Sequence, residues 1–234
     1  MERRGFLSAC AAVAGASQIG VLSEVWAVAA AREYPRARLI DIHGDPLIVG
    51  RLVPRTNYVF NYPYAGTPCF LLDLGRPVVA ARELLRADGS AYAWSGGVGP
   101  SRSIVAYSAI CAHKLAYPTR EVSFIRFQPD RSPTSDGDVI HCCADHSVYD
   151  PSAGARVMSG PAPQPLAAIV LEYDPERDAL AAIGTVGAEQ FDAFFHKYDF
   201  KLALEYGQGH ARQPAGDTTV VRELAQYCRQ TIRC

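Results

Sequence analysis

The chain has 234 residues, 49% of them hydrophobic and 20% charged, an ordinary balance for a globular protein with one main domain. Its 23 Lys and Arg residues are offset by 24 Asp and Glu residues, which leaves a net charge of −1. This near-balance argues against nucleic-acid binding, because holding phosphates requires an excess of basic side chains.

The first 30 residues are predicted to be a targeting segment. Arg3 and Arg4 precede an uncharged stretch over 6–23 that is rich in Ala and Gly, and small residues follow at 27–29. The pattern resembles a twin-arginine export signal, which predicts a periplasmic location. The alternative is an uncleaved anchor in contact with the membrane, because about 18 uncharged residues can just span a bilayer.

Beyond residue 38, short apolar runs alternate with turn residues. This pattern predicts a mostly β fold, a sandwich or a barrel. We expect strands within the following ranges: 39–40, 47–49, 59–60, 70–72, 104–107, 122–127, 169–173 and 179–183.

Helices are expected at 79–87, at 188–198 and at 218–233, the last capped by Asp217 and preceded by a linker over 207–216. The middle helix places its aromatic residues at helical spacing on one face, which favours a core position over a docking face. These residues are Phe191, Phe194, Phe195 and Tyr198.

Two short motifs carry the candidate chemistry. Cys111 and His113 form a C-x-H motif, and about thirty residues later Cys143 and His146 form a C-x-x-H motif. Two thiolates and two imidazoles can bind a tetrahedral zinc ion or a [2Fe–2S] cluster. Because each motif mixes one Cys with one His, the pattern favours a cluster with both sulfurs on one iron and both imidazoles on the other.

A third segment, 160–166, contains three prolines in the sequence GPAPQPL and is therefore stiff. We interpret it as a lid that excludes water from the cluster. The alternative is a rigid turn between two strands.

The two motifs and the proline-rich segment together resemble the Rieske family, over about 58–184. The resemblance implies a Rieske-type β-sandwich or barrel over 38–186, with a smaller cluster-binding lobe over about 104–166. The signal or anchor over 1–30 precedes this domain, and a helical C-terminal extension over 187–234 follows it.

The resemblance also implies the residues that bind the [2Fe–2S] cluster. The metal ligands would be Cys111, His113, Cys143 and His146. Ser147 and Tyr149 would donate hydrogen bonds to cluster sulfurs, which raises the reduction potential. For Tyr149 the alternative is a strand aromatic that only packs inward.

The second motif can be matched to the family in another way. A gap-free match through Ser147 places Cys142 and Asp145 at the ligand positions, which would make the cluster atypical, labile or missing. We prefer Cys143 with His146, because the outer iron of the family receives imidazole. The disulfide that bridges the two cluster loops in the family is expected to be absent. An Asp145 carboxylate close to the cluster would lower its potential.

The remaining cysteines have simpler interpretations. Cys69 precedes an apolar strand and is expected to be a buried small residue. A disulfide between Cys228 and Cys234 is left open as a possible pairing in an oxidising compartment.

The function implied by the resemblance is electron transfer, in an oxidoreductase subunit that has no catalytic residues of its own. Residues 74–77 and 96–100 are similar to the small Rieske subunit of arsenite oxidase. The expected partners are then a larger molybdopterin subunit and a soluble electron carrier. Two alternatives remain: a quinol-oxidising Rieske subunit of a cytochrome bc-type complex, and a structural subunit that has lost its cluster.

Overall fold

The computed structural model describes residues 31–234, and its many short strands confirm the expected mostly β fold. The predicted export signal, with its twin arginines, lies outside the described residues. Among the residues described, no helix is both long enough and apolar enough to cross a membrane.

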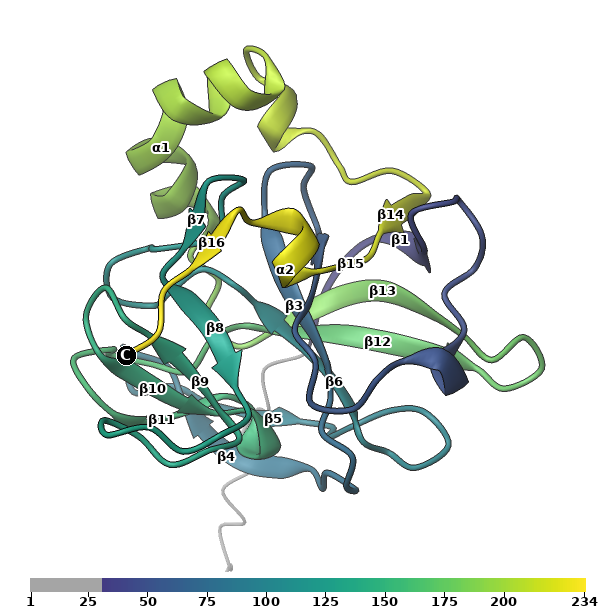
Figure 1. Ribbon diagram of the computed structural model, residues 1–234, viewed down its shortest axis with the longest axis horizontal. Helices are drawn as coiled ribbons and strands as arrows, with labels where there is room; N and C mark the ends of the chain where they lie inside the picture. Colours follow the sequence, from purple (N-terminus) through teal and green to yellow (C-terminus); the bar gives the residue numbers. More distant parts are fainter. Residues whose placement is uncertain (1–30) are drawn as a thin grey trace, which may run out of the picture.

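An eight-stranded sheet forms the larger part of the molecule, in the order β14-β1-β13-β12-β6-β3-β2-β15 (Figure 1). Its strands are β1 (Arg32–Ile40), β2 (Tyr58–Asn61), β3 (Pro68–Asp73), β6 (Ile104–Ser108), β12 (Ala168–Asp174), β13 (Ala179–Val186), β14 (Thr218–Val220) and β15 (Arg222–Glu223).

The two edges of this sheet approach one another. β14 and β15 are consecutive in the chain but lie at opposite ends of the strand order. The hydroxyl of Thr219 donates to the carbonyl of Asn61 at 2.9 Å and accepts the Asn61 backbone N–H at 3.3 Å. These two hydrogen bonds of the Thr219 side chain connect β14 to β2, where no ladder of backbone hydrogen bonds joins the two strands. The sheet is thereby nearly closed into a barrel.

The central strands are buried on both faces. On β3, Phe70 and Leu72 pack into one apolar cluster, while Cys69 and Leu71 pack into a second cluster on the opposite face. This double burial explains why these strands read as continuous apolar runs. It also confirms Cys69 as a buried residue.

A second, four-stranded sheet has the order β11-β10-β9-β8 and lies beside the barrel (Figure 1). Its strands are β8 (Ile125–Gln128), β9 (Val139–Cys142), β10 (Ser147–Asp150) and β11 (Arg156–Ser159). Two small pairs complete the β structure: β4 (Ala81–Leu85) with β5 (Ala91–Trp94), and β7 (Val122–Ser123) with β16 (Gln230–Thr231).

The helix predicted at 79–87 is wrong, because this segment contains β4, which pairs with β5 in an antiparallel hairpin. Leu84 is its buried anchor, whereas Arg82, Glu83 and Leu85 are exposed. Pairing with the neighbouring strand has therefore overridden a modest local helix propensity.

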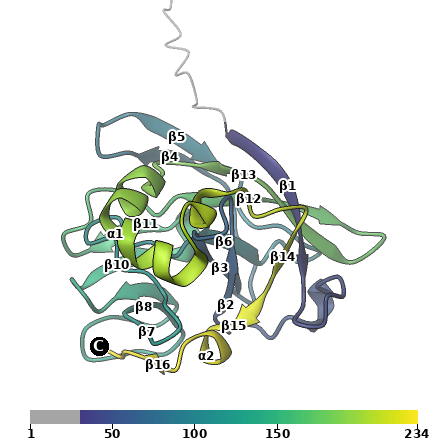
Figure 2. The same cartoon turned by 90° about the horizontal axis from the view of Figure 1, so that it is seen from above.

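The helix predicted at 218–233 is also wrong. The segment forms β14, β15, the one-turn helix α2 (Leu224–Tyr227) and β16. The β-branched residues at 218–220 pair with β1 in parallel, and Gln230–Thr231 pair with β7. The C-terminal tail consequently runs beside the four-stranded sheet, and the chain ends there in both views (Figures 1 and 2).

The remaining helix, α1 (Phe191–Tyr206), confirms the predicted aromatic helix and extends it by two turns. Phe191, Phe194 and Phe195 are buried in a third apolar cluster, so its aromatic face is core. The expected linker over 207–216 is packed instead: Ala211 is buried, and its carbonyl accepts the Gly66 N–H at 2.9 Å.

Candidate metal centre

The first motif lies in a tight loop after β6, which we call the first tip (residues 111–116). The Cys111 N–H donates to the Ala116 carbonyl at 2.9 Å, and the Leu115 N–H donates to the Cys111 carbonyl at 3.0 Å. These two bonds fix the loop locally. Cys111 is fully buried, whereas the side chain of His113 remains 35% exposed.

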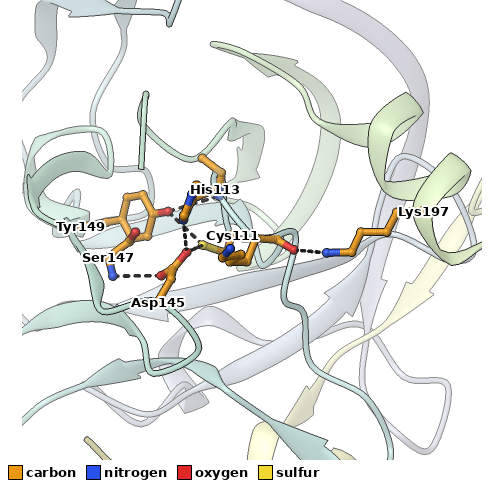
Figure 3. A network of polar contacts seen from close by, with 8 residues as sticks. Cys111, His113, Asp145, Ser147, Tyr149 and Lys197 are labelled. Carbon is orange, nitrogen blue, oxygen red and sulfur yellow. Dashed lines mark hydrogen bonds and ion pairs between the residues drawn. The ribbon is translucent and has the colours of Figure 1, made fainter. Parts of the chain in front are cut away.

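Helix α1 supports this tip from outside. The Lys197 ammonium donates to the Lys114 carbonyl within the tip (Figure 3). Just beyond the tip, the ring of Tyr117 contacts the ring of Phe194 edge-on, with centroids 4.8 Å apart. The C-terminal part of the chain therefore helps to hold the first motif in place.

The second motif lies at the turn between β9 and β10, which we call the second tip (residues 142–147). Cys142 faces Ser147 across the hairpin, and the His146 N–H donates to the Cys142 carbonyl at 2.7 Å. Successive side chains on a strand point to opposite faces. Cys142 and Ile140 therefore share the inner face with Tyr149, while His141 takes the outer face.

The two tips bring together the sulfurs of Cys111 and Cys142, a carboxylate and an imidazole. Figure 3 shows the Asp145 carboxylate between the Cys111 sulfur and the His113 ring. The ligand atoms of Cys111, Cys142 and Asp145 all lie within 4.8 Å of one another. One oxygen of Asp145 is 3.2 Å from the Cys111 sulfur and 3.0 Å from Nδ1 of His113. The carboxylate is only 2% exposed, so the imidazole is the one donor that reaches the surface.

The preferred ligand pair of the second motif, Cys143 with His146, is not brought to this site. Cys143 forms a disulfide with Cys234, so its sulfur is not available as a thiolate ligand. The ring of His146 instead lies beside His141, with centroids 5.9 Å apart. Successive side chains at the end of β9 point to opposite sides, so Cys142 faces Cys111 while Cys143 faces the tail at Ile232. The turn after β9 then directs Asp145, and not His146, into the site.

The same disulfide replaces the pairing considered for Cys228 and Cys234. Cys228 is instead a buried free thiol in the structure. Cys228 follows the one-turn helix α2, and the strand β16 after it carries the chain end away from Cys228, to the four-stranded sheet. The pairing of Cys143 with Cys234 spans 91 residues, and nothing in the local sequence indicated it.

The Tyr149 hydroxyl points toward the Cys111 sulfur, as expected (Figure 3). The Tyr149 hydroxyl lies 3.4 Å from the Cys111 sulfur and accepts the Ala112 N–H at 3.2 Å. The Ser147 hydroxyl is buried and has no hydrogen-bond partner among the described residues. A buried hydroxyl of this kind normally has a partner, so Ser147 remains available to donate to a further acceptor group.

The ionisation of the site suits a bound cation. A hydrogen bond from Cys142 lowers the pKa of Cys111 and raises the pKa of Cys142. Burial works to raise the pKa of Asp145, but the Ser147 N–H and the two thiols donate to the carboxylate and hold its pKa below the usual range. Two buried groups that carry or readily take negative charge require a compensating positive charge.

These residues fit a [2Fe–2S] centre by their donor chemistry. They supply two buried sulfurs, a buried carboxylate, a partly exposed imidazole, and a buried hydroxyl that could donate to a sulfide. Two ligands depart from the preferred set: Cys142 takes the place of Cys143, and Asp145 takes the place of His146.

The proline-rich segment at 160–166 lies against the second tip. Gly160 has a φ of 89°, and a side-chain carbon added there would be 2.5 Å from the His146 carbonyl oxygen. Only glycine fits so close an approach. Two residues later, Ala162 packs against the apolar cluster that contains both Cys111 and Cys142. This position supports the interpretation of the segment as a lid.

The chain is similar to solved structures, although no family model matches it. Among solved structures, it is similar to the soluble domain of the Rieske protein II (SoxF) from Sulfolobus acidocaldarius, with 28% sequence identity and a TM-score of 0.47. The match covers 65% of this chain and 78% of that chain.

Proposed function

We propose that this chain is an electron-transfer protein that holds one Rieske-type [2Fe–2S] cluster between its two tips. Cys111 and Cys142 would bind one iron, and His113 and Asp145 the other. The observation that carries the proposal is the meeting of two fully buried sulfurs from separate loops, beside a half-exposed imidazole and a buried carboxylate.

When bound, the cluster would supply a centre that gains and loses one electron. The chain's own residues set its surroundings. Burial of both cysteines excludes water from the sulfurs, and Tyr149 is placed to donate a hydrogen bond to Cys111. His113, as the exposed ligand, offers the shortest path to a partner at the surface.

Iron and acid-labile sulfide analysis of the purified chain tests this proposal, together with EPR spectroscopy after reduction. We expect equal amounts of iron and sulfide and a reduced-cluster EPR signal, both lost in Cys111→Ser. Cys69→Ala is the matched control, because Cys69 is equally buried but lies in a different apolar cluster. A folded protein without sulfide contradicts the assignment.

A single tetrahedral metal ion is the second candidate, and one observation favours it. Three donor atoms lie within 4.8 Å of one another. Around a zinc ion with Zn–S bonds of about 2.3 Å, neighbouring ligands lie roughly 3.8 Å apart. Such a centre would be structural, and it would give zinc without sulfide in the same analysis.

We further propose that the chain works outside the cytoplasm, as the small subunit of an arsenite oxidase-like oxidoreductase. The twin-arginine pattern in residues 1–30 and the resemblance of residues 74–77 and 96–100 support this assignment. The partners would be a larger molybdopterin subunit and a soluble electron carrier.

Isolation of the native protein from a periplasmic extract, with N-terminal sequencing and identification of co-purifying chains, tests this assignment. A molybdopterin protein that co-purifies with a cleaved chain is the expected result. An intact N-terminus in a membrane fraction, with an EPR signal that responds to quinone, indicates the cytochrome bc-type alternative instead.

A further inference from the structure

A second group of potential metal ligands gathers around His141, on the outer face of β9. His141, His146 and Cys234 place their ligand atoms within 4.8 Å of one another. Cys143 joins this group through its disulfide with Cys234. The Cys143 sulfur therefore lies one bond away from a group of one sulfur and two imidazoles, at a place separate from the first site.

We propose that reduction of the Cys143–Cys234 disulfide converts this group into a Zn²⁺ site, with Cys143, Cys234, His141 and His146 as its four ligands. Two thiolates and two imidazoles are one of the standard ligand sets of structural zinc. The set is distinct from the residues proposed for the cluster, which use the opposite face of β9.

The environment of His141 leaves one of its ring nitrogens available to bind a metal ion. Its side chain is 1% exposed, and Nδ1 lies 3.1 Å from the hydroxyl of Ser135. The other ring nitrogen, Nε2, is buried and has no hydrogen-bond partner among the described residues. Metal-bound histidines commonly bind the metal with one nitrogen while a second group orients the other. Ser135 supplies that orientation here, and Nε2 remains free for a metal.

The tail stays in place without the disulfide. The Gln230 N–H donates to the Glu121 carbonyl at 3.1 Å, and the Ile232 N–H donates to the Ser123 carbonyl at 2.9 Å. The Arg126 side chain also donates to the Ile232 carbonyl at 3.1 Å. Cutting the disulfide therefore releases only the last two residues of the chain.

The movement required of Cys234 is small. Two sulfurs joined in a disulfide are about 2 Å apart, whereas two sulfurs on one zinc ion are roughly 3.8 Å apart. Cys234 lies two residues beyond the last backbone hydrogen bond of the tail, so its sulfur can retreat by this amount without disturbing β16. His146 is exposed and Cys234 half-buried, which leaves a path for the ion from solvent.

The reaction balances with a phosphine as reductant. A trialkylphosphine gives two electrons to the disulfide and becomes the phosphine oxide, with water supplying its oxygen and the two thiol protons. Zn²⁺ then binds both sulfurs as thiolates and releases those two protons. Because the disulfide and the zinc site use the same sulfurs, the two states exclude each other. Reducing conditions favour the metal, and oxidising conditions favour the disulfide.

Zinc content and affinity of the full chain test the proposal. The purified protein is incubated with Zn²⁺ alone, before and after phosphine reduction, then desalted and analysed for metal. We expect one additional zinc ion per chain after reduction, with the iron content unchanged. The Cys111→Ser variant should show the same gain, because its defect lies in the other site. A gain that disappears in Cys111→Ser would place the zinc in the first site and overturn the proposal.

Two variants test the ligands directly. Cys234→Ala and His141→Ala should each lower the zinc affinity of the reduced chain at least tenfold, while His196→Ala, an exposed histidine on α1, should not. Cys234→Ala changes only the terminal residue and leaves the core intact, so it remains informative if His141→Ala fails to fold. Reduction that exposes two new thiols without any gain of zinc refutes the site.

Discussion

The two tips that build the candidate centre are held by different forces. The first tip is closed by its own backbone hydrogen bonds and supported by the packing of α1. The second tip belongs to the β9–β10 hairpin, and a disulfide ties it to the end of the chain. One centre therefore depends on two independent supports, so one tip can be disturbed by substitution while the other stays in place.

The sharpest contrast lies within the second tip, between two neighbouring cysteines. We expect Cys142→Ser to abolish bound iron and the EPR signal, because its sulfur faces Cys111 in the buried site. Cys143→Ser should retain both, because its sulfur faces the tail. Iron analysis and EPR of the two variants decide the matter, and the reverse pattern would restore Cys143 as the ligand.

Removal of the helix support should produce the next largest effect. Phe194→Ala empties a fully buried site beneath the first tip and should cost about 3–5 kcal/mol in the free energy of unfolding. Phe200→Ala on the same helix removes a ring that is 78% exposed and should cost less than about 0.5 kcal/mol. Urea unfolding measures both, and amide exchange over 111–117 should accelerate only in Phe194→Ala.

Loss of the disulfide should weaken the second tip by a smaller amount. Cys234→Ser opens a loop of 91 residues and should lower the free energy of unfolding by about 2–4 kcal/mol, mainly through greater freedom of the unfolded chain. Cys143→Ser and the double variant should match it, measured by urea unfolding with a metal chelator present. Additive losses in the double variant would mean that the two sulfurs act separately.

The carboxylate in the second tip should set the reduction potential. Asp145→His replaces an anionic ligand with imidazole and should raise the potential by on the order of a hundred millivolts, as imidazole ligands do in Rieske centres relative to all-thiolate ones. Asp150→Asn removes a negative charge from the same hairpin without touching the sulfurs and is the control. A redox titration followed by EPR that shows no rise would remove Asp145 from the ligand set.

The smallest effect is expected from one hydroxyl group. Tyr149→Phe removes the hydroxyl next to the Cys111 sulfur and should lower the potential by on the order of tens of millivolts. Tyr107→Phe removes an equally buried hydroxyl that donates to the Pro151 carbonyl, so it should cost stability but leave the potential unchanged. Equal potentials in the two variants would assign Tyr149 a packing role only.

Much of the architecture followed from local pattern. Alternating apolar runs predicted the strands around residues 70 and 105, and aromatic spacing predicted the helix that begins at Phe191, because these signals depend on neighbours close in sequence. The positions of Cys111, His113 and Tyr149 near one another were also anticipated from the two motifs.

Tertiary contacts decided the rest. Sequence alone left open whether Cys142 or Cys143 points inward, because a shift of one residue in strand register reverses every side chain. Residues 79–87 and 218–233 carry some helical pattern, yet the first segment forms a separate hairpin with β5, and the second pairs with β1, β2 and β7 around one helical turn. The disulfide between Cys143 and Cys234 joins residues that become neighbours only when the tail has paired with β7. Because the two cysteines are 91 residues apart, no local sequence pattern can predict this pairing.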